Sequence, residues 1–371
     1  MASAVDGSPE EERDRLAVEG QELAERLEDR TALFLLEVGL ASSRTLCGWS
    51  REGPLVPAQR AVEIAQDLNR EAQFLAHFII GNVLFLQGSV TEALRETEEA
   101  LELAGSDLEL GAQFFGFSLG NFALFQKACL LMWRGSPREA AGCFERSLEV
   151  ARERNEQMVV CQVSCHFGPS FEELTGISQQ ALSRSQQAVE QAERSGDFKS
   201  RTTAQQHLGW AQLMHGHVAE ALDTLQHVGQ LMQERVPADI GLNLTHGLLA
   251  EAYLAAGDAA SARTVANRCL AARQGWVYDL RAHLSRSRVL RALDGADAQT
   301  EIEASLESAQ HLLEKSGARA FAPFIIEERA RLAEVLGDAE GAAQHLREAQ
   351  RAFAEVEATG HAERLERELH G

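Results

Sequence analysis

Small and apolar residues recur along the chain at a spacing that predicts a series of paired helices. The stretch 209–228 shows the pattern. An apolar-faced helix ends at Gly216, and a second helix that carries Ala221 begins after it. Similar stretches surround Gly88 and Gly257. Glycine can close a helix in the left-handed conformation, which other residues resist. The sequence therefore predicts a chain of helix–turn–helix units.

Eight turn glycines mark these units, separated by 35 to 47 residues: Gly53, Gly88, Gly135, Gly176, Gly216, Gly257, Gly295 and Gly337. Five residues after each glycine stands a small residue, with one exception at Thr300: Ala58, Ala93, Ala140, Ala181, Ala221, Ala262, Thr300 and Ala342. Twelve residues after each glycine come Ala65, Ala100, Ser147, Ala188, Val228, Cys269, Glu307 and Ala349. Residues seven apart lie on one face of a helix, so paired small residues let a neighbouring helix approach closely.

The repeat sets the expected domain boundaries. Residues 1–11 are predicted to be a disordered leader, 12–29 a lone helix and 358–371 a C-terminal capping helix. Between them we expect one solenoid over 12–357, with repeats near 31–69, 71–104, 118–153, 157–194, 199–233, 240–273, 277–315 and 319–355. The unit at 157–194 is degenerate, because Pro169 breaks the pattern where a small helical residue is expected.

The segment Leu208 to Leu222 carries the pattern Leu-Gly-x-Ala-x-x-x-x-Gly-x-x-x-Glu-Ala-Leu, which resembles the tetratricopeptide repeat. The spacing here exceeds the usual repeat of about 34 residues. This longer form is similar to the C-terminal helical region of bacterial signalling ATPases, maltose-regulator-type activators and multidomain nucleotide cyclases, and the stretch 317–369 looks most like the end of such proteins. The resemblance implies an all-α, right-handed superhelical solenoid of about eight repeats.

In the family that the chain resembles, the first helix of each repeat lines the concave groove. The resemblance implies that positions 13, 10, 6, 3 and 2 before each turn glycine point into it. The groove candidates are Phe78, Asn82, Phe85, Phe122, Phe125, Cys129, Trp133, His166 and Trp210. Such a groove could bind an amphipathic helix or an apolar peptide through its aromatic anchors. Alternatively, the long connection 105–117 packs these rings into a core, and we favour this interpretation of the rings.

Composition and charge narrow the classes of partner. With 35 basic and 56 acidic residues the net charge is −21, so phosphate backbones and anionic lipid surfaces are poor partners. The six cysteines are scattered, without the spacing of a disulfide framework. The acidic N-terminus has no apolar signal segment, and no apolar run reaches the roughly 18 residues of a membrane span. We therefore expect a cytoplasmic protein that binds neither nucleic acid nor membrane.

The motifs of catalysis and cofactor binding are missing. The chain has no GxxxxGK[ST] phosphate loop, no GxGxxG after a strand and no HExxH, so we expect no enzymatic activity and no cofactor. Cys161 and Cys165 lie one helical turn apart beside His166, but a zinc site needs a second pair of ligands, which is not visible. Two buried thiols are the favoured interpretation. Metal binding by the histidines near Gly216 is also disfavoured, because two of them flank the turn.

Three functions remain open. The first is a non-enzymatic scaffold that binds a peptide or protein segment in its groove, in bacterial signal transduction. The second is a ligand-sensing regulatory region of a signalling ATPase, nucleotide cyclase or transcriptional regulator, separated from its catalytic domains. The half-repeat at the start favours the second, and Met1 with the acidic leader favours the first. The third, a peptide-pheromone receptor, predicts a groove with Asn and Arg clamps and ranks lower, because Asn82 is the only obvious groove asparagine. A homodimer is left open.

Overall fold

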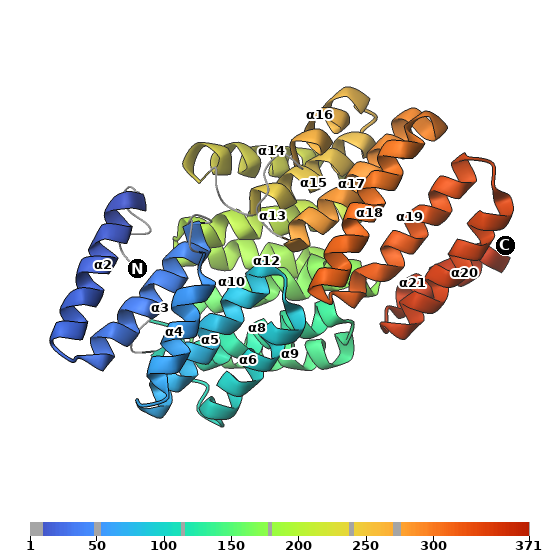
Figure 1. Ribbon diagram of the computed structural model, residues 1–371. Helices are drawn as coiled ribbons and strands as arrows, with labels where there is room; N and C mark the ends of the chain where they lie inside the picture. The colour runs from blue at the N-terminus through green and yellow to red at the C-terminus, as the bar shows by residue number, and fades with distance from the viewer. Residues whose placement is uncertain are drawn as a thin grey trace. The chain divides into compact units, whose positions relative to one another are not determined.

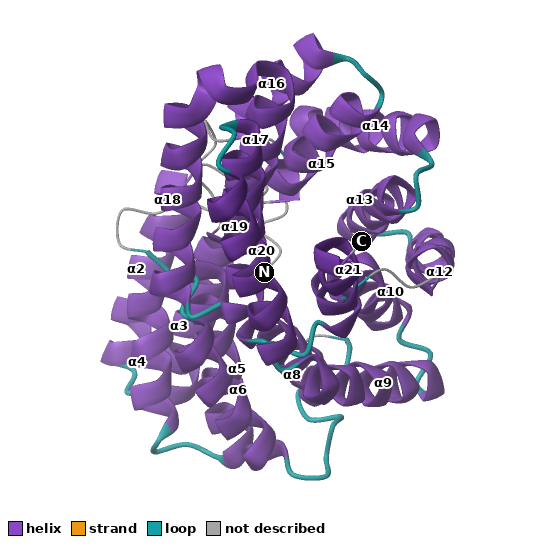
Figure 2. Ribbon diagram, turned by 90° about the vertical axis from the view of Figure 1, so that its right-hand side faces the viewer, coloured by secondary structure: helices purple, strands orange, loops and turns teal. Residues whose placement is uncertain are grey.

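The computed structural model describes residues 10–47, 53–112, 116–176, 180–236, 241–269 and 276–370, and all regular structure in these ranges is helical (Figure 2). The chain forms two compact units, residues 1–130 and 131–371. The single solenoid over 12–357 stays a prediction, and the boundary between the two units falls within one helix. Each unit is described by itself below.

The first unit contains α2 (Glu10–Arg26), α3 (Arg30–Cys47), α4 (Leu55–Ala65), α5 (Arg70–Gln87), α6 (Val90–Ala104) and the first turns of α8 (Leu119–Arg134) (Figure 1). Neighbouring helices pack in chain order, α2 on α3, α3 on α4, α4 on α5 and α5 on α6. Asn69 caps α5 by accepting a hydrogen bond from the Ala72 amide at 2.9 Å, which satisfies one of the free N–H groups of the first turn. The core of this unit is apolar and rich in phenylalanine.

The second unit begins with the end of α8 and continues as helix pairs. They are α9 (Pro137–Glu153), α10 (Gln157–Cys165) with α11 (Phe171–Thr175), α12 (Gln180–Ser195), α13 (Phe198–Met214), α14 (Val218–Arg235), α15 (Gly241–Ala255), α16 (Ala259–Cys269), α17 (Trp276–Asp294), α18 (Gln299–Ser316), α19 (Ala322–Val335), α20 (Ala339–Glu355) and α21 (Thr359–His370). The first helices of successive pairs also contact one another, α10 with α13, α13 with α15, α15 with α17 and α17 with α19. These first helices therefore form one continuous layer of the second unit.

The turn glycines take the conformation that the sequence predicts. All eight have positive φ, for example 77° at Gly216, where a side chain would be strained. The alanines five residues later are 0% to 4% exposed, so they lie where two helices touch. Thr300 is exposed because a short 3₁₀ segment, Gly295–Ala298, follows Gly295 and shifts the buried face of α18. Ile302 and Ala309, both 0% exposed, take the two inward positions instead.

The ends of the solenoid differ slightly from the predicted boundaries. α2 begins at Glu10, inside the predicted leader 1–11, and residues 1–9 lie outside the described part of the chain. The lone helix, predicted to reach residue 29, ends at Arg26, and Glu28 then turns the chain with a φ of 53°. The capping helix α21 runs from Thr359 to His370.

The fourth repeat is interrupted where the sequence places a proline. After α10 the backbone forms a wide π-type turn, His166–Ser170, in which Gly168 has non-helical angles (φ −91°, ψ −117°). Pro169 has no N–H to donate to the carbonyl oxygen four residues earlier, and its ring clashes with that carbonyl, so the regular α-helix cannot continue through it. The Arg184 Nη1 donates a hydrogen bond to the Phe167 carbonyl oxygen at 2.7 Å. Because the backbone is not helical at Gly168, the side chains after the turn point in a different direction from those of a continuous helix.

The C-terminal helix α21 folds back onto the fourth repeat, as Figure 2 shows near α10. His361 Nε2 donates a hydrogen bond to the Glu173 carbonyl oxygen at 2.7 Å. At the same place the backbones of Gly176 and Gly360 meet, so closely that a Cβ built on Gly360 would lie 2.9 Å from the Gly176 Cα. The second unit thus brings its last helix against its α11 helix.

Candidate binding cavity

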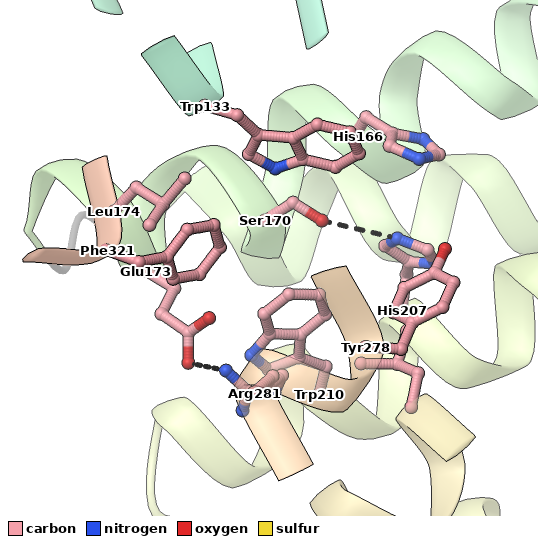
Figure 3. A pocket seen from close by; sticks show the side chains of 11 residues that line it. Trp133, His166, Ser170, Glu173, Leu174, His207, Trp210, Tyr278, Arg281 and Phe321 are labelled. Atoms are coloured by element: carbon pink, nitrogen blue, oxygen red, sulfur yellow. Dashed lines mark hydrogen bonds and ion pairs between the residues drawn. The ribbon is translucent and has the colours of Figure 1, made fainter. Parts of the chain in front are cut away.

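A cavity lies in the second unit, against the layer of first helices (Figure 3). Its volume is about 30 Å³, and it opens to solvent. Its walls are mainly aromatic and aliphatic, with a few polar groups: Trp133, His166, Ser170, Glu173, Leu174, His207, Trp210, Leu244, Tyr278, Arg281 and Phe321. Apolar walls with a small number of placed polar groups are typical of ligand sites.

These side chains come from consecutive repeats. The end of α8 supplies Trp133, the interrupted helix of the fourth repeat supplies four residues, and α13, α15 and α17 supply five more. Phe321 comes from the 3₁₀ turn Arg319–Phe321 that leads into α19. An occupant of the cavity would therefore touch most repeats of the second unit at once.

Two histidines on one side of the cavity are held in the neutral form. The His207 Nδ1–H donates to the Thr203 carbonyl oxygen at 2.8 Å, which leaves Nε2 as the acceptor of the Ser170 hydroxyl at 3.4 Å. Burial, together with the nearby His166, lowers the pKa of His207 to about 3, although the hydrogen bond to Thr203 acts in the opposite sense. Burial also lowers the pKa of His166. Neither imidazole carries charge near neutral pH.

Arg281 is the one cationic side chain among the lining residues of this cavity, and it is 6% exposed. Its Nη1 donates to the Glu173 carboxylate, and its Nη2 lies 3.7 Å from the Glu251 Oε2. The guanidinium carbon lies 4.5 Å from the centroid of the Trp210 ring, a cation–π contact. Figure 3 shows the Glu173–Arg281 pair beside the nitrogen edge of Trp210.

The Glu173–Arg281 pair is the start of a ladder of alternating charges. Glu251 also accepts from Arg288 Nη1 at 3.0 Å, and Arg288 Nε donates to Glu328 at 2.8 Å. Arg291 lies 3.4 Å from the other oxygen of Glu328. We call these six residues (Glu173, Arg281, Glu251, Arg288, Glu328 and Arg291) the ion ladder. With three arginines and three glutamates it is electrically neutral.

Three of the groove candidates line the cavity together, namely Trp133, His166 and Trp210. The offsets from Gly176 that pointed to His166 also gave Ser170 and Glu173, which lie in the same wall. Trp133 additionally packs edge-on against Trp276 at 5.4 Å between ring centroids. The structure therefore brings together one candidate each from the third, fourth and fifth repeats.

The candidates of the first unit are packed against each other. Phe78 meets Phe122 edge-on at 6.1 Å between centroids, and Phe122 meets Phe125 at 5.1 Å. Phe117, from the long connection, contacts Phe122 at 5.5 Å, as the core interpretation of these rings requires. Residues 113–115 of that connection lie outside the described part of the chain. Of the other candidates, Asn82 and Phe85 are half-buried, and Cys129 is buried.

The sequence reasoning missed Arg281, Tyr278 and His207. The groove offsets counted from Gly295 select Ala282 and so miss Arg281 by one position. His207 was considered only as a metal ligand. Arg281 is a basic residue on the first helix of its repeat, and Trp276 and Tyr278 stand shortly before it in the sequence. That combination was the signal that could have identified it.

The two thiols of the fourth repeat do not belong to the cavity. Cys161 and Cys165 are wholly buried and pack against Ala188, Ala192 and Ala204. Burial raises the pKa of the Cys165 thiol well above its usual value. Within the described ranges no three His, Cys, Asp or Glu side chains gather in a way that could hold a metal ion.

Comparison with known proteins places the fold. No family model matches the chain, and no curated protein sequence matches it. Among solved structures, a Rap protein complexed with competence and sporulation factor is similar over 93% of this chain and 94% of its own, with 16% identity and a TM-score of 0.65. NprR in complex with its cognate peptide NprX is similar over 90% of this chain and 97% of its own, with 12% identity and a TM-score of 0.57. In the described residues no helix is both long enough and apolar enough to span a membrane. The chain therefore has an all-α fold of tetratricopeptide-like helical repeats.

Proposed function

We propose that this protein binds a short peptide or an extended protein segment, without chemistry of its own, as a receptor or scaffold in bacterial signal transduction. The observation that carries the proposal is the cavity of the second unit, whose lining side chains come from consecutive first helices. A ligand there would contact several repeats at once, so its binding energy could change how those repeats pack.

The fold comparison supports the same class of ligand. One of the similar structures is NprR in complex with its cognate peptide, and the likeness extends over nearly the full length of both chains. The arginines of α17 and the uncharged polar groups of the cavity can also form hydrogen bonds with a peptide. A peptide presents alternating hydrogen-bond donors and acceptors beside its apolar side chains. Metabolites with several phosphates suit it less, since every arginine of the ion ladder is already paired.

The experiment is affinity selection from a defined library. The purified full chain is incubated with a synthetic library of linear hexapeptides, complexes are separated by gel filtration, and retained peptides are identified by mass spectrometry. We expect a family of related peptides that the double variant Trp133→Ala/Trp210→Ala no longer retains. The variant Phe85→Ala, in the first unit, is the matched control and should retain the same peptides.

Circular dichroism and thermal unfolding establish that each variant is folded. Retention of the same peptides by the double variant would place binding elsewhere on the chain. Recovery of no related peptides by the wild-type chain would contradict the proposed function itself.

A further inference from the structure

Resting on the proposed function, we infer how its site is regulated: the C-terminal segment 356–361 latches the second unit closed over the cavity, and a peptide enters only when this latch opens. The inference is drawn from the small volume of the cavity, from the contacts of this segment with the third and fourth repeats, and from a residue that these contacts share with the cavity wall.

The cavity in its present state is too small for a peptide residue. Its volume is about 30 Å³, and a buried water molecule takes roughly 10–15 Å³ on this measure, so there is room for about two waters. Two of the indole rings that line it, Trp133 and Trp210, are 7% and 6% exposed. A ligand that touches several first helices therefore requires the walls of the cavity to separate.

One part of the cavity is bounded by repeats that are not neighbours in the chain. Trp133 lies at the end of the first helix of the third repeat, Leu174 lies in the fourth repeat, and Phe321 leads into the eighth. In a solenoid each repeat contacts only its neighbours, as α13 contacts α15 and α15 contacts α17. The approach of the eighth repeat to the third and fourth is an additional closure, which needs contacts of its own.

Two of these contacts depend on glycine. A Cβ built on Gly135, in the turn before α9, would lie 3.0 Å from the Val356 Cγ1. A Cβ built on Gly360 would lie 2.9 Å from the Gly176 Cα. At both positions a side chain would crowd the opposite segment, so glycine is what allows the approach. We call these two contacts, together with the hydrogen bond of His361 described next, the latch.

The third contact of the latch is made by a residue of the cavity wall. His361 Nε2 donates to the Glu173 carbonyl oxygen at 2.7 Å, and its ring contacts those of Phe353 and Phe324 at 4.8 and 5.2 Å between centroids. The carboxylate of the same glutamate accepts from Arg281 of the seventh repeat. Glu173 thus joins the cavity to the latch, since its side chain faces one and its main chain the other.

The latch is a small contact compared with the packing of adjacent repeats. An ion pair between Arg138 and Glu357, at 3.6 Å, joins the same segments, but the Arg138 side chain is 80% exposed and the pair adds little. Segments with few buried apolar contacts open at a low cost in free energy, while the repeats themselves stay folded. A ligand that binds only the open state pays for the opening, so its apparent affinity falls with the closed fraction.

The first test asks whether the latch keeps the tryptophans of the second unit away from solvent. The full chain with Trp49→Phe retains three buried indoles, all in the second unit: Trp133, Trp210 and Trp276. The double variant Gly360→Ala/His361→Phe introduces the backbone clash, removes the hydrogen bond to Glu173 and keeps an aromatic ring at position 361. We expect acrylamide to quench its tryptophan fluorescence at least about twice as strongly as that of wild type, because opening exposes the indoles.

The matched control makes the same two exchanges away from the latch. In Gly142→Ala/His370→Phe the new Cβ meets nothing within 4 Å, and His370 is exposed. Its fluorescence should be quenched as in wild type. Circular dichroism and thermal unfolding establish that both double variants are folded, so that stronger quenching reports opening of the latch and not loss of the fold.

The second test measures peptide binding by isothermal titration calorimetry. The hexapeptides that wild type retains from the library are titrated into wild type and both double variants. We expect Gly360→Ala/His361→Phe to bind them about fivefold more tightly, because the cost of opening has been removed, and the control to bind them as wild type does. A variant with a merely damaged site would bind more weakly.

Equal quenching of wild type and folded Gly360→Ala/His361→Phe would overturn the inference, and so would weaker peptide binding by that variant. The two tests also separate this inference from the proposed function. Stronger quenching of the latch variant, with no related hexapeptides retained by any of the proteins, would support the closure by the latch and contradict peptide binding.

Discussion

Gly209 lies in the middle of α13, where a glycine ordinarily weakens a helix. A Cβ built on it would lie 2.6 Å from the Leu225 Cγ, and Leu225 is wholly buried in α14. Alanine at this position would gain up to about 1 kcal/mol of helix propensity. It would also force the buried leucine aside, which costs about 1–3 kcal/mol in a packed core. The close approach of the two helices thus outweighs the helix preference.

The first prediction follows at this residue. Gly209→Ala is expected to lower the free energy of unfolding by about 1 kcal/mol. Gly142→Ala is the matched control, because Gly142 lies inside α9 and a Cβ there meets nothing within 4 Å. The control should stabilise the protein by about 0.5–1 kcal/mol. Urea unfolding followed by circular dichroism measures both, and equal effects of the two substitutions would contradict the packing argument.

A second residue-scale prediction concerns His207, whose pKa burial lowers to about 3. Above pH 6.5 both folded and unfolded chains hold this imidazole neutral, so it contributes no pH dependence. Between pH 6.5 and about 3 the unfolded chain binds a proton that the folded chain does not. Stability should therefore fall as the pH falls, by up to about 1.4 kcal/mol per pH unit from this group.

The measurement compares variants across that window. His207→Gln removes the titrating group and can still hydrogen-bond to Ser170 or Thr203, so its stability should depend less steeply on pH between 6.5 and 4.5 than that of wild type. His217→Gln, at an exposed histidine, is the control and should keep the wild-type slope. Parallel slopes for all three proteins would show that His207 is protonated in the folded state.

At the scale of elements, the chain shows both what its sequence could predict and what it could not. The turn glycines and the small residues five positions after them are local signals that predict turns and helix contacts. The positive φ of Gly216 and the burial of Ala221 agree with these predictions. Pro169 predicts an interruption, but not the direction in which the π-type turn aims Glu173. The contact of α21 with α11 joins residues 188 apart, His361 and Glu173, and no local pattern encodes it.

The docking of α21 is open to a direct test. A Cβ on Gly360 would lie 2.9 Å from the Gly176 Cα and 3.2 Å from the Thr175 carbonyl oxygen, and backbone atoms cannot step aside as a side chain can. We expect Gly360→Ala to detach α21 from α11. Hydrogen exchange should then speed up in the amides of α21 by about tenfold or more. Glu366→Ala, on the exposed face of α21, is the control. Unchanged protection in Gly360→Ala would mean that the contact contributes little.

On the scale of the whole molecule, the two units fill their interiors differently. The first unit packs phenylalanine rings against one another, with Phe78, Phe122 and Phe125 in one cluster. The second places the ion ladder along α11, α15, α17 and α19. Rings packed edge-on have no charged partner to exchange, whereas paired charges can be re-paired by a ligand that offers donors and acceptors. The proposed peptide site therefore lies in the unit that contains the ion ladder.

The ion ladder leads to the last prediction, at Glu251, where it branches to two arginines. Burial raises the pKa of this carboxyl, but Arg288, Arg281 and the Ser285 hydroxyl outweigh burial, and the pKa is lowered overall. Glu251→Gln leaves Arg288 and Arg281 short of a counter-charge, so we expect a loss of about 3 kcal/mol of stability.

Removing Arg288 as well restores the charge balance, since Glu173 keeps Arg281 and Glu328 keeps Arg291. The double variant Glu251→Gln/Arg288→Met should therefore lose less stability than the sum of its single variants, by at least about 1 kcal/mol in a double-mutant cycle. The coupling should persist in high salt, because buried pairs are screened much less than exposed ones. Glu363→Gln on the exposed face of α21 is the control. Strictly additive losses of stability would show that the ladder acts as separate contacts. A ligand that binds at Arg281 would then have no effect on α19 through the ladder.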